Sequence, residues 1–143
     1  MRLTLVTARV VRKNERYAYK LVGKGERYLV KHKEGENAGD KVIQELTYDA
    51  EEPVIVVQTQ LLKNNVEFIE DEKADRFFNA KVEYTELTDD GKREKKVKDR
   101  YIVQANTAKE AFNRLSAVIN ADDDCITTVA ITNIIDVIQW LSQ

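Results

Sequence analysis

The sequence predicts an α+β fold, in which one or two helices pack on an antiparallel sheet. Three patterns in residues 77–138 lead to this prediction: alternating apolar and polar residues, an Asp-Gly pair between two such runs, and an apolar stripe at helical spacing. The length of 143 residues suits one compact domain. Strands followed by a helix recur loosely in two possible halves, 1–70 and 77–143, and an acidic connector joins these halves. We identify no clear sequence repeat between them.

A long hairpin is the most clearly predicted element. Apolar residues occupy every second position from Phe78 to Tyr84, as in a half-buried strand. Asp90-Gly91 favours a tight turn, because glycine adopts positive φ at low cost. A two-residue turn there gives the partners Phe78 with Val103, Ala80 with Tyr101, Tyr84 with Val97, Glu83 with Lys98 and Glu86 with Lys95. Asp99 breaks the pattern, opposite Val82, and indicates a bulge, a sheet edge or a site.

A helix and a long strand are predicted after the hairpin. Thr107 and Glu110 have the spacing of a capping box at a helix start, and an apolar stripe continues to Ile119, before Asn120 ends the helix. The segment from Cys125 to Ile138 is rich in Ile, Val and Thr, which favours a strand. Its alternation falters at Thr132-Asn133, where we expect either a bulge or the end of the strand.

The first half is predicted to begin with a basic antiparallel meander. Residues 42–48 have the composition of a strand, although Asp40 could also cap a short helix there, and we favour the strand. Apolar residues at positions 62, 66 and 69 fit one side of a helix. The predicted strands are 2–12, 16–22, 26–33, 42–48 and 54–57, and the predicted helix is 61–74.

Bulk properties exclude several classes of protein. No apolar run approaches the ~20 residues of a membrane-spanning helix. The first residues alternate like a strand and lack the apolar block of a signal peptide. Cys125 is the only cysteine, so no disulfide forms within one chain, and a reducing, cytoplasmic setting fits. We therefore expect a cytoplasmic protein without a membrane partner.

No catalytic or metal-binding motif stands out. His32 is the only histidine and lies far from Cys125 in the sequence, so we interpret it as a strand-surface residue and predict no His/Cys metal site. Asp122-Asp123-Asp124 lacks the spacing of a calcium loop and fits a solvated turn. Gly23-Lys24-Gly25 lacks the pattern of a phosphate-binding loop. We predict no catalytic residue and no cofactor, and an enzyme is the least favoured of three hypotheses.

Charge is distributed unevenly, although the net charge is only −2. Residues 1–33 hold ten Lys/Arg and two Glu, a net +8, whereas residues 34–76 hold four Lys/Arg and twelve Asp/Glu, a net −8. Residues 77–143 have a net charge of −2. Of all features of the sequence, this polarity points most directly to function.

The basic segment predicts binding to nucleic acid, with single strands favoured. Lysine and arginine contact phosphates, and exposed aromatic rings stack on bases. The residues that we expect to form this site are Arg9, Arg12, Tyr17, Tyr19, Lys20, Lys24, Arg27, Tyr28 and Lys31. A second basic patch runs from Lys92 to Arg100, but its expected cross-strand partners, Glu83 and Glu86, neutralise part of it.

A protein-interaction or oligomeric assembly module is the alternative hypothesis. In this case the tyrosines lie in the core, and the +8 segment meets the −8 segment within one molecule or between copies. Either segment could also bind another protein. A salt-sensitive oligomer without affinity for nucleic acid would favour this alternative.

Several short segments within residues 77–138 resemble a known group of proteins. These segments are Phe78 to Tyr84, Asp90-Gly91-Lys92, Lys95-Lys96-Val97, Tyr101 to Ala105 and Thr107 to Ala111. They are similar to a family of uncharacterised small proteins of Bacteroidetes and their phages. The resemblance implies a protein of a phage or mobile element in the bacterial cytoplasm. We expect a non-enzymatic accessory protein, and under the assembly hypothesis its partner is a second copy or a host or phage protein. The resemblance implies no activity and no catalytic residue.

Overall fold

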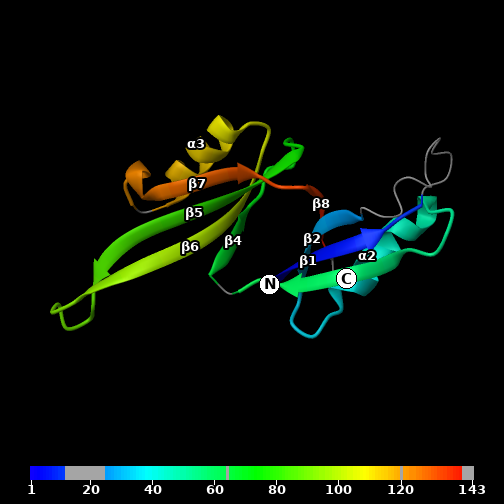
Figure 1. Ribbon diagram of the computed structural model, residues 1–143, viewed down its shortest axis with the longest axis horizontal. Coiled ribbons are helices and arrows are strands. Elements are labelled where there is room, and N and C mark those ends of the chain that lie inside the picture. Colours follow the sequence, from blue (N-terminus) through cyan, green and yellow to red (C-terminus); the bar gives the residue numbers. More distant parts are fainter. Residues whose placement is uncertain (12–24, 64, 120, 140–143) are drawn as a thin grey trace. The chain divides into compact units, whose positions relative to one another are not determined.

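A computed structural model describes residues 1–11, 25–63, 65–119 and 121–139 of the chain (Figure 1). The chain divides into two units: residues 1–62 and 133–143 belong to unit 1, and residues 63–132 belong to unit 2. The described part of each unit has one four-stranded, mostly antiparallel sheet and one α-helix. The predicted α+β fold is therefore confirmed. The acidic stretch around residues 70–75 lies within unit 2, between its first two strands.

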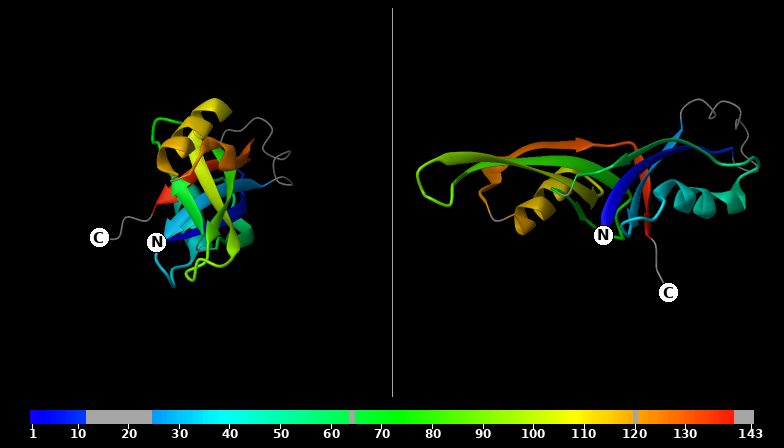
Figure 2. Two further views of the ribbon diagram at one scale, coloured as in Figure 1. Left: turned by 90° about the vertical axis from the view of Figure 1, so that its left-hand side faces the viewer. Right: turned by 90° about the horizontal axis from the view of Figure 1, so that it is seen from below.

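In unit 1 the strand order is β3-β1-β2-β8. β1 pairs antiparallel with both β2 and β3, whereas β8 runs parallel to β2. The elements are β1 (Arg2–Arg9), β2 (Glu26–His32), α2 (Ala38–Leu46), the 3-10 helix η1 (Thr47–Asp49), β3 (Ile55–Leu61) and β8 (Ile134–Gln139). Figure 2 shows α2 along one face of this sheet.

In unit 2 the strand order is β4-β6-β5-β7. β5 pairs antiparallel with both β6 and β7, whereas β4 runs parallel to β6. The elements are β4 (Val66–Ile69), β5 (Arg76–Leu87), β6 (Glu94–Ala105), α3 (Ala108–Val118), the 3-10 helix η2 (Asp123–Cys125) and β7 (Ile126–Ile131). α3 lies along one face of this second sheet (Figure 2).

The two units have the same topology. Each contains an antiparallel pair, then a helix, then a third strand antiparallel to the first, and a fourth strand parallel to the second. The fourth strands are exchanged along the chain: β4 follows β3 but joins the sheet of unit 2, and β8 follows β7 but joins the sheet of unit 1. The strands β1, β2, β3 and β8 are therefore equivalent to β5, β6, β7 and β4.

The register of the sheets reveals a sequence repeat. Thr4 pairs with Val30 and Leu61, just as Phe78 pairs with Val103 and Ile131. In each unit the pairing between the first and third strands shifts register at an equivalent place. The shift lies between Thr7 and Ala8 in unit 1 and between Lys81 and Val82 in unit 2. This alignment sets Glu26-Arg-Tyr-Leu-Val30 against Asp99-Arg-Tyr-Ile-Val103, and Ile135-Asp-Val-Ile138 against Val66-Glu-Phe-Ile69. The structure thus shows an internal duplication that sequence analysis did not identify.

Equivalent caps begin the two helices. The side chain of Asn37 accepts a hydrogen bond from the backbone N–H of Asp40, and Thr107 accepts one from Glu110. Each cap satisfies a backbone donor that the first helical turn leaves free. The predicted start of the second helix at Thr107 is therefore confirmed, although the Glu110 carboxylate contacts Arg114 instead of turning back to the cap.

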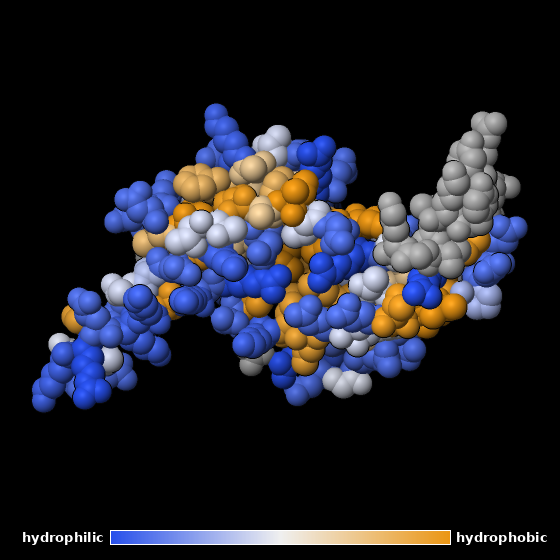
Figure 3. Space-filling model, viewed as in Figure 1, coloured by the Kyte–Doolittle hydropathy of each residue, from blue (hydrophilic) through white to orange (hydrophobic). Residues whose placement is uncertain are grey.

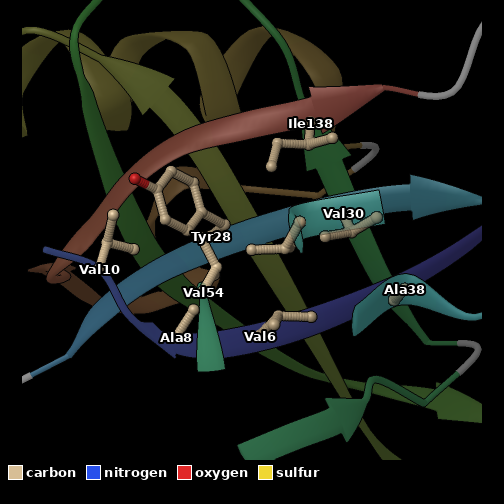
Figure 4. Close-up of a cluster of buried hydrophobic side chains, with 9 residues drawn as sticks. Val6, Ala8, Val10, Tyr28, Val30, Ala38, Val54 and Ile138 are labelled. Atoms are coloured by element: carbon tan, nitrogen blue, oxygen red, sulfur yellow. The ribbon is translucent and has the colours of Figure 1, made fainter. Parts of the chain in front are cut away.

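Each helix covers a core made by alternate strand residues. In unit 1 the buried residues come from β1, β2, β8 and α2, and from the positions directly after β1 and directly before β3 (Figure 4). They are Val6, Ala8, Val10, Tyr28, Val30, Ala38, Val42, Val54 and Ile138. In unit 2 they are Phe78, Ala80, Val82, Tyr101, Val103, Ala105, Ala111 and Leu115. The predicted apolar face of the hairpin is thus the face that α3 covers.

The predicted hairpin register is confirmed in every pair. Phe78 lies opposite Val103, Tyr84 opposite Val97, and Asp99 opposite Val82. The turn is longer than the two residues expected, because strand pairing stops at Leu87 and Glu94. Residues 88–93 between them are held by backbone hydrogen bonds, and Gly91 has a φ of +69°.

Residues 42–48 are helical or in η1, so the strand that we favoured there is wrong. α2 begins after Asn37, not at Asp40. Val42 is fully buried, whereas Ile43 and the two residues after it are exposed. A good cap and one buried helical face outweigh the β-branched composition of this segment.

The predicted helix at 61–74 is also wrong. Val66–Ile69 forms β4, which pairs in parallel with β6. The spacing of apolar residues in this segment fits a helix, but the segment instead completes a sheet whose other strands come later in the chain. Tertiary context therefore overrides the local pattern.

Two predicted chain paths are revised. β1 and β2 pair directly and antiparallel, whereas the first and third strands of a meander would run parallel. The predicted strand 16–22 lies outside the described residues. The predicted strand from Cys125 to Ile138 is two strands, because β7 ends at Ile131 and β8 begins at Ile134 in the other unit. The faltering alternation at Thr132-Asn133 marks this passage.

Candidate nucleic-acid interface

The predicted site falls partly outside the described residues. Arg12, Tyr17, Tyr19, Lys20 and Lys24 all lie in the segment 12–24. The structure places the other four, which are Arg9, Arg27, Tyr28 and Lys31.

Tyr28 is placed where it cannot stack on a base. Its side chain is only 4% exposed and lies among the buried hydrophobic side chains of unit 1 (Figure 4). The phenol hydroxyl donates a hydrogen bond to Oε2 of Glu26 at 3.0 Å. Tyr28 lies opposite Val6, on the face of the sheet that α2 covers, and its ring therefore packs in the core. The role that we assigned to Tyr28 is therefore withdrawn.

The three remaining cations share the opposite face of this sheet. Arg9 is exposed and forms no ion pair with any residue that the structure describes. Arg27 is half-buried and donates from Nη1 to Oδ1 of Asn133 at 3.2 Å. Lys31 is half-buried. Leu29 lies between Arg27 and Lys31 and is fully buried, so this face is not an open platform.

An ion pair joins the basic and acidic segments of unit 1. Arg2 forms an ion pair with Glu34 at 3.4 Å, and the Glu34 carboxylate is largely exposed. An exposed pair of this kind contributes little to stability. It neutralises the first cation of the basic segment and leaves Arg9 unpaired within the described part.

A second cationic face lies on the hairpin of unit 2, on the side opposite to α3. It contains four cations in three successive cross-strand pairs, namely Lys81 with Arg100, Glu83 with Lys98, and Thr85 with Lys96. Lys81, Lys96 and Lys98 are exposed. None of the four cations forms an ion pair with any residue in the described ranges. The expected pairs Glu83–Lys98 and Glu86–Lys95 thus lie opposite each other without a close contact.

A small hollow lies within this cationic face. It has a volume of about 230 Å³ and is lined by Asn65, Lys81, Glu83, Lys98, Asp99 and Arg100. Asn65 fixes its rim by donating from Nδ2 to the backbone oxygen of Lys98 at 3.3 Å. Arg100 donates from Nε to Oδ1 of Asn79 at 2.6 Å, which orients its guanidinium. Three cations against two carboxylates give the hollow a positive balance, which suits a phosphate group.

The two cationic faces contain equivalent arginines. Arg27 and Arg100 occupy the same place in the sequence repeat, opposite Thr7 and Lys81. An asparagine amide oxygen accepts a hydrogen bond from each guanidinium. Sequence analysis named Arg27 and treated the patch that ends at Arg100 as partly neutralised. The shared sequence Glu/Asp-Arg-Tyr is the signal that would have identified these two arginines as equivalent.

Asp99 belongs to a cluster with tyrosines on the α3 side of the hairpin. Burial raises the pKa of Tyr84, and the charge of Asp99 raises it further. Burial also raises the pKa of Tyr101, followed by the negative charges of Glu67 and Asp99. Tyr84 and Cys125 line a second hollow of about 500 Å³. Asp99 pairs with Val82 without a register shift in the hairpin, so it is not a bulge there.

His32 is buried, so its interpretation as a surface residue is wrong. It is 5% exposed, and Nδ1 donates to the backbone oxygen of Lys33 at 2.8 Å. Nε2 lies 2.6 Å from Oγ1 of Thr4. Both ring nitrogens therefore have partners. No three His, Cys, Asp or Glu side chains converge as metal ligands in the part of the chain that the structure describes.

Comparisons with known proteins identify one family. A family model described as Domain of unknown function (DUF4494) matches residues 7–140. Comparison with curated proteins and with solved structures gives no match. Within the described ranges, neither helix has the length and apolar character needed to cross a membrane.

Proposed function

The chain belongs to the DUF4494 family, and we propose that it binds nucleic acid, with single strands favoured, through exposed cations on its sheets. One observation carries the proposal: Lys81, Lys96, Lys98 and Arg100 line one face of the hairpin without ion pairs among the described residues. In the hydropathy view, hydrophilic residues cover the end of this hairpin (Figure 3).

The spacing of these cations suits a polyanion. Lys96, Lys98 and Arg100 are alternate residues of β6, so their side chains leave one face about 6.8 Å apart. Side chains that are not already paired can release counterions from phosphates, and this release drives non-specific binding to nucleic acid. The hollow between Lys81, Lys98 and Arg100 gives one phosphate a defined position.

The N-terminal cations extend the proposed function to unit 1. Arg9 and Arg27 share one face of its sheet, and Arg27 is the counterpart of Arg100. The preference for single strands depends on Tyr17 and Tyr19, because Tyr28 is buried.

The resemblance to small proteins of Bacteroidetes and their phages supports a biological setting. In this setting the protein is a non-enzymatic accessory protein of a phage or mobile element. It acts on nucleic acid in the cytoplasm of the bacterial host.

A binding assay with matched variants tests the proposal. Fluorescence anisotropy would follow a labelled single-stranded oligonucleotide and a duplex of equal length at low salt. The double variant Lys96→Gln/Lys98→Gln removes two cations of the hairpin face, and we expect it to bind both probes more weakly. The control Lys73→Gln/Lys109→Gln removes the same charge from exposed sites elsewhere in unit 2, and we expect a much smaller loss.

The same assay can reject the proposal. Absence of binding by the wild type at low salt, or equal losses in the two double variants, would contradict it. A salt-sensitive oligomer that binds no nucleic acid would instead favour assembly through the +8 and −8 segments.

A further inference from the structure

The β3 strand leaves one edge of the unit 1 sheet without a partner among the described residues. β3 is the outermost strand, and β1 occupies its other side. Its seven residues, Ile55–Leu61, contain no charge. Ile55 and Leu61 are each 57% exposed, and every residue of the strand except Val56 is exposed. An edge of this kind is a template for pairing with another strand, because its outer N–H and C=O groups are available.

The uncharged composition of β3 differs from that of two other edge strands. β8 and β4, the exchanged fourth strands, each contain a carboxylate, Asp136 or Glu67. Charged residues at a sheet edge are a common protection against unwanted pairing. β7, the counterpart of β3, also lacks charge. Only the third strands of the duplication are thus left without this protection in the described part of the chain.

The charges that flank β3 indicate a second copy as the partner. Exposed Glu51 and Glu52 precede the strand, and exposed Lys63 follows it. Antiparallel pairing of two β3 strands places the lysine end of each beside the glutamate end of the other. Parallel pairing would bring like charges together. β7 lacks this complementarity, because Asp122-Asp123-Asp124 precedes it and no cation follows it closely.

We propose that two copies of the chain associate through antiparallel pairing of their β3 strands, to form a continuous eight-stranded sheet from two unit 1 sheets. The contact is isologous, since the same strand contributes from both copies. Main-chain hydrogen bonds supply the affinity, as in other cases of strand addition. The centre of the contact lies at Gln58, the middle residue of β3, and Gln60 shares its face of the strand.

Charge substitution at the centre of β3 tests this proposal. The variants Gln58→Lys/Gln60→Lys and Gln58→Glu/Gln60→Glu each place like charges across the contact. Both glutamines are exposed, so the fold tolerates either change. Sedimentation velocity on nuclease-treated protein should show wild-type mass rising with concentration from one chain toward two. Each variant alone should remain a monomer, and an equimolar mixture should associate again, because lysine then faces glutamate.

A control variant and two possible outcomes determine whether the proposed dimer stands. The variant Gln44→Lys/Asn113→Lys adds the same charge on exposed helical positions and should associate like the wild type. A wild type that is monomeric at all concentrations overturns the proposal. Association that survives in both charged variants also overturns it. Neither outcome bears on nucleic-acid binding, which is tested separately on β6.

Discussion

The two units share one plan, but among the described residues the strand pairing of the hairpin extends further in unit 2. In unit 2, β7 pairs with residues 78–82 of β5 and β4 pairs with residues 100–103 of β6, yet the hairpin continues to Leu87 and Glu94. In unit 1, β1 ends at Arg9 and β2 begins at Glu26. The shared part builds the sheet and core, whereas the extension adds Lys96 and Lys98. The comparison separates the residues that stabilise the fold from the residues that we propose to bind nucleic acid.

The repeat also explains why a basic strand with tyrosine is not a stacking surface. Tyr28 and Tyr101 are equivalent, and both lie on the face that a helix covers. A carboxylate neighbours each ring in its own strand, Glu26 for Tyr28 and Asp99 for Tyr101. The arginine between carboxylate and tyrosine points to the other face in both units. Alternation along the strand thus divides the repeat into a core tyrosine and a surface arginine.

The largest expected effect concerns two equivalent core residues, Leu29 and Ile102. Each is at most 1% exposed and lies on the face opposite to the helix. Leu29→Ala and Ile102→Ala should each lower the free energy of unfolding by about 2–5 kcal/mol, because each leaves a cavity in packed surroundings. Urea unfolding would measure both. A loss below about 0.5 kcal/mol in either variant, typical of a surface position, would break the equivalence of the units.

A smaller effect is expected at the two helix caps. Asn37→Ala and Thr107→Ala each remove the side-chain acceptor for a backbone N–H in the first turn. Each should lower the free energy of unfolding by about 0.5–2 kcal/mol. Thr85→Ala, at an exposed strand position, is the control and should change it much less. If one cap variant behaved like this control, the two helices would not begin in the same way.

The smallest expected effect is on how the free energy of unfolding depends on pH. It arises from Glu36, which belongs to unit 1. A hydrogen bond from the Lys41 ammonium lowers the pKa of Glu36, and one from the backbone N–H of Lys33 lowers it further. Because the folded pKa lies below the unfolded value, this stabilisation is complete above the ordinary glutamate pKa. It is lost as the pH falls through the lowered folded value.

Unfolding at several pH values would measure this contribution. Glu36→Gln should be less stable than the wild type near neutral pH, and the difference should shrink once the pH falls below about 4. A difference between the two proteins that stays constant over this range would show that the Lys41 contact does not depend on the Glu36 charge.

Sequence reasoning succeeded where the signals are local. The hairpin register follows from alternation around Asp90-Gly91, and the start of α3 follows from Thr107. It failed where a segment completes a distant sheet, as Val66–Ile69 does by joining β6. It also failed at 42–48, where composition favours a strand but Asn37 caps a helix.

The candidate site was predictable only in part. The excess of cations before residue 34 and at 92–100 is visible in the sequence. Alternation alone could not show which side of β2 meets a helix, so the burial of Tyr28 was missed. Cross-strand order was predicted correctly for Glu83 and Lys98, but opposite positions do not guarantee an ion pair between long side chains.

The salt dependence of binding tests the central claim most directly. The logarithm of the association constant for a single-stranded oligonucleotide, plotted against the logarithm of salt concentration, gives a slope proportional to the number of phosphates neutralised. We predict a steep negative slope for the wild type and a slope shallower by about 1.4 for Lys96→Gln/Lys98→Gln, which loses two contacts. An identical slope and affinity in the two proteins would contradict the assignment of the hairpin face to nucleic acid.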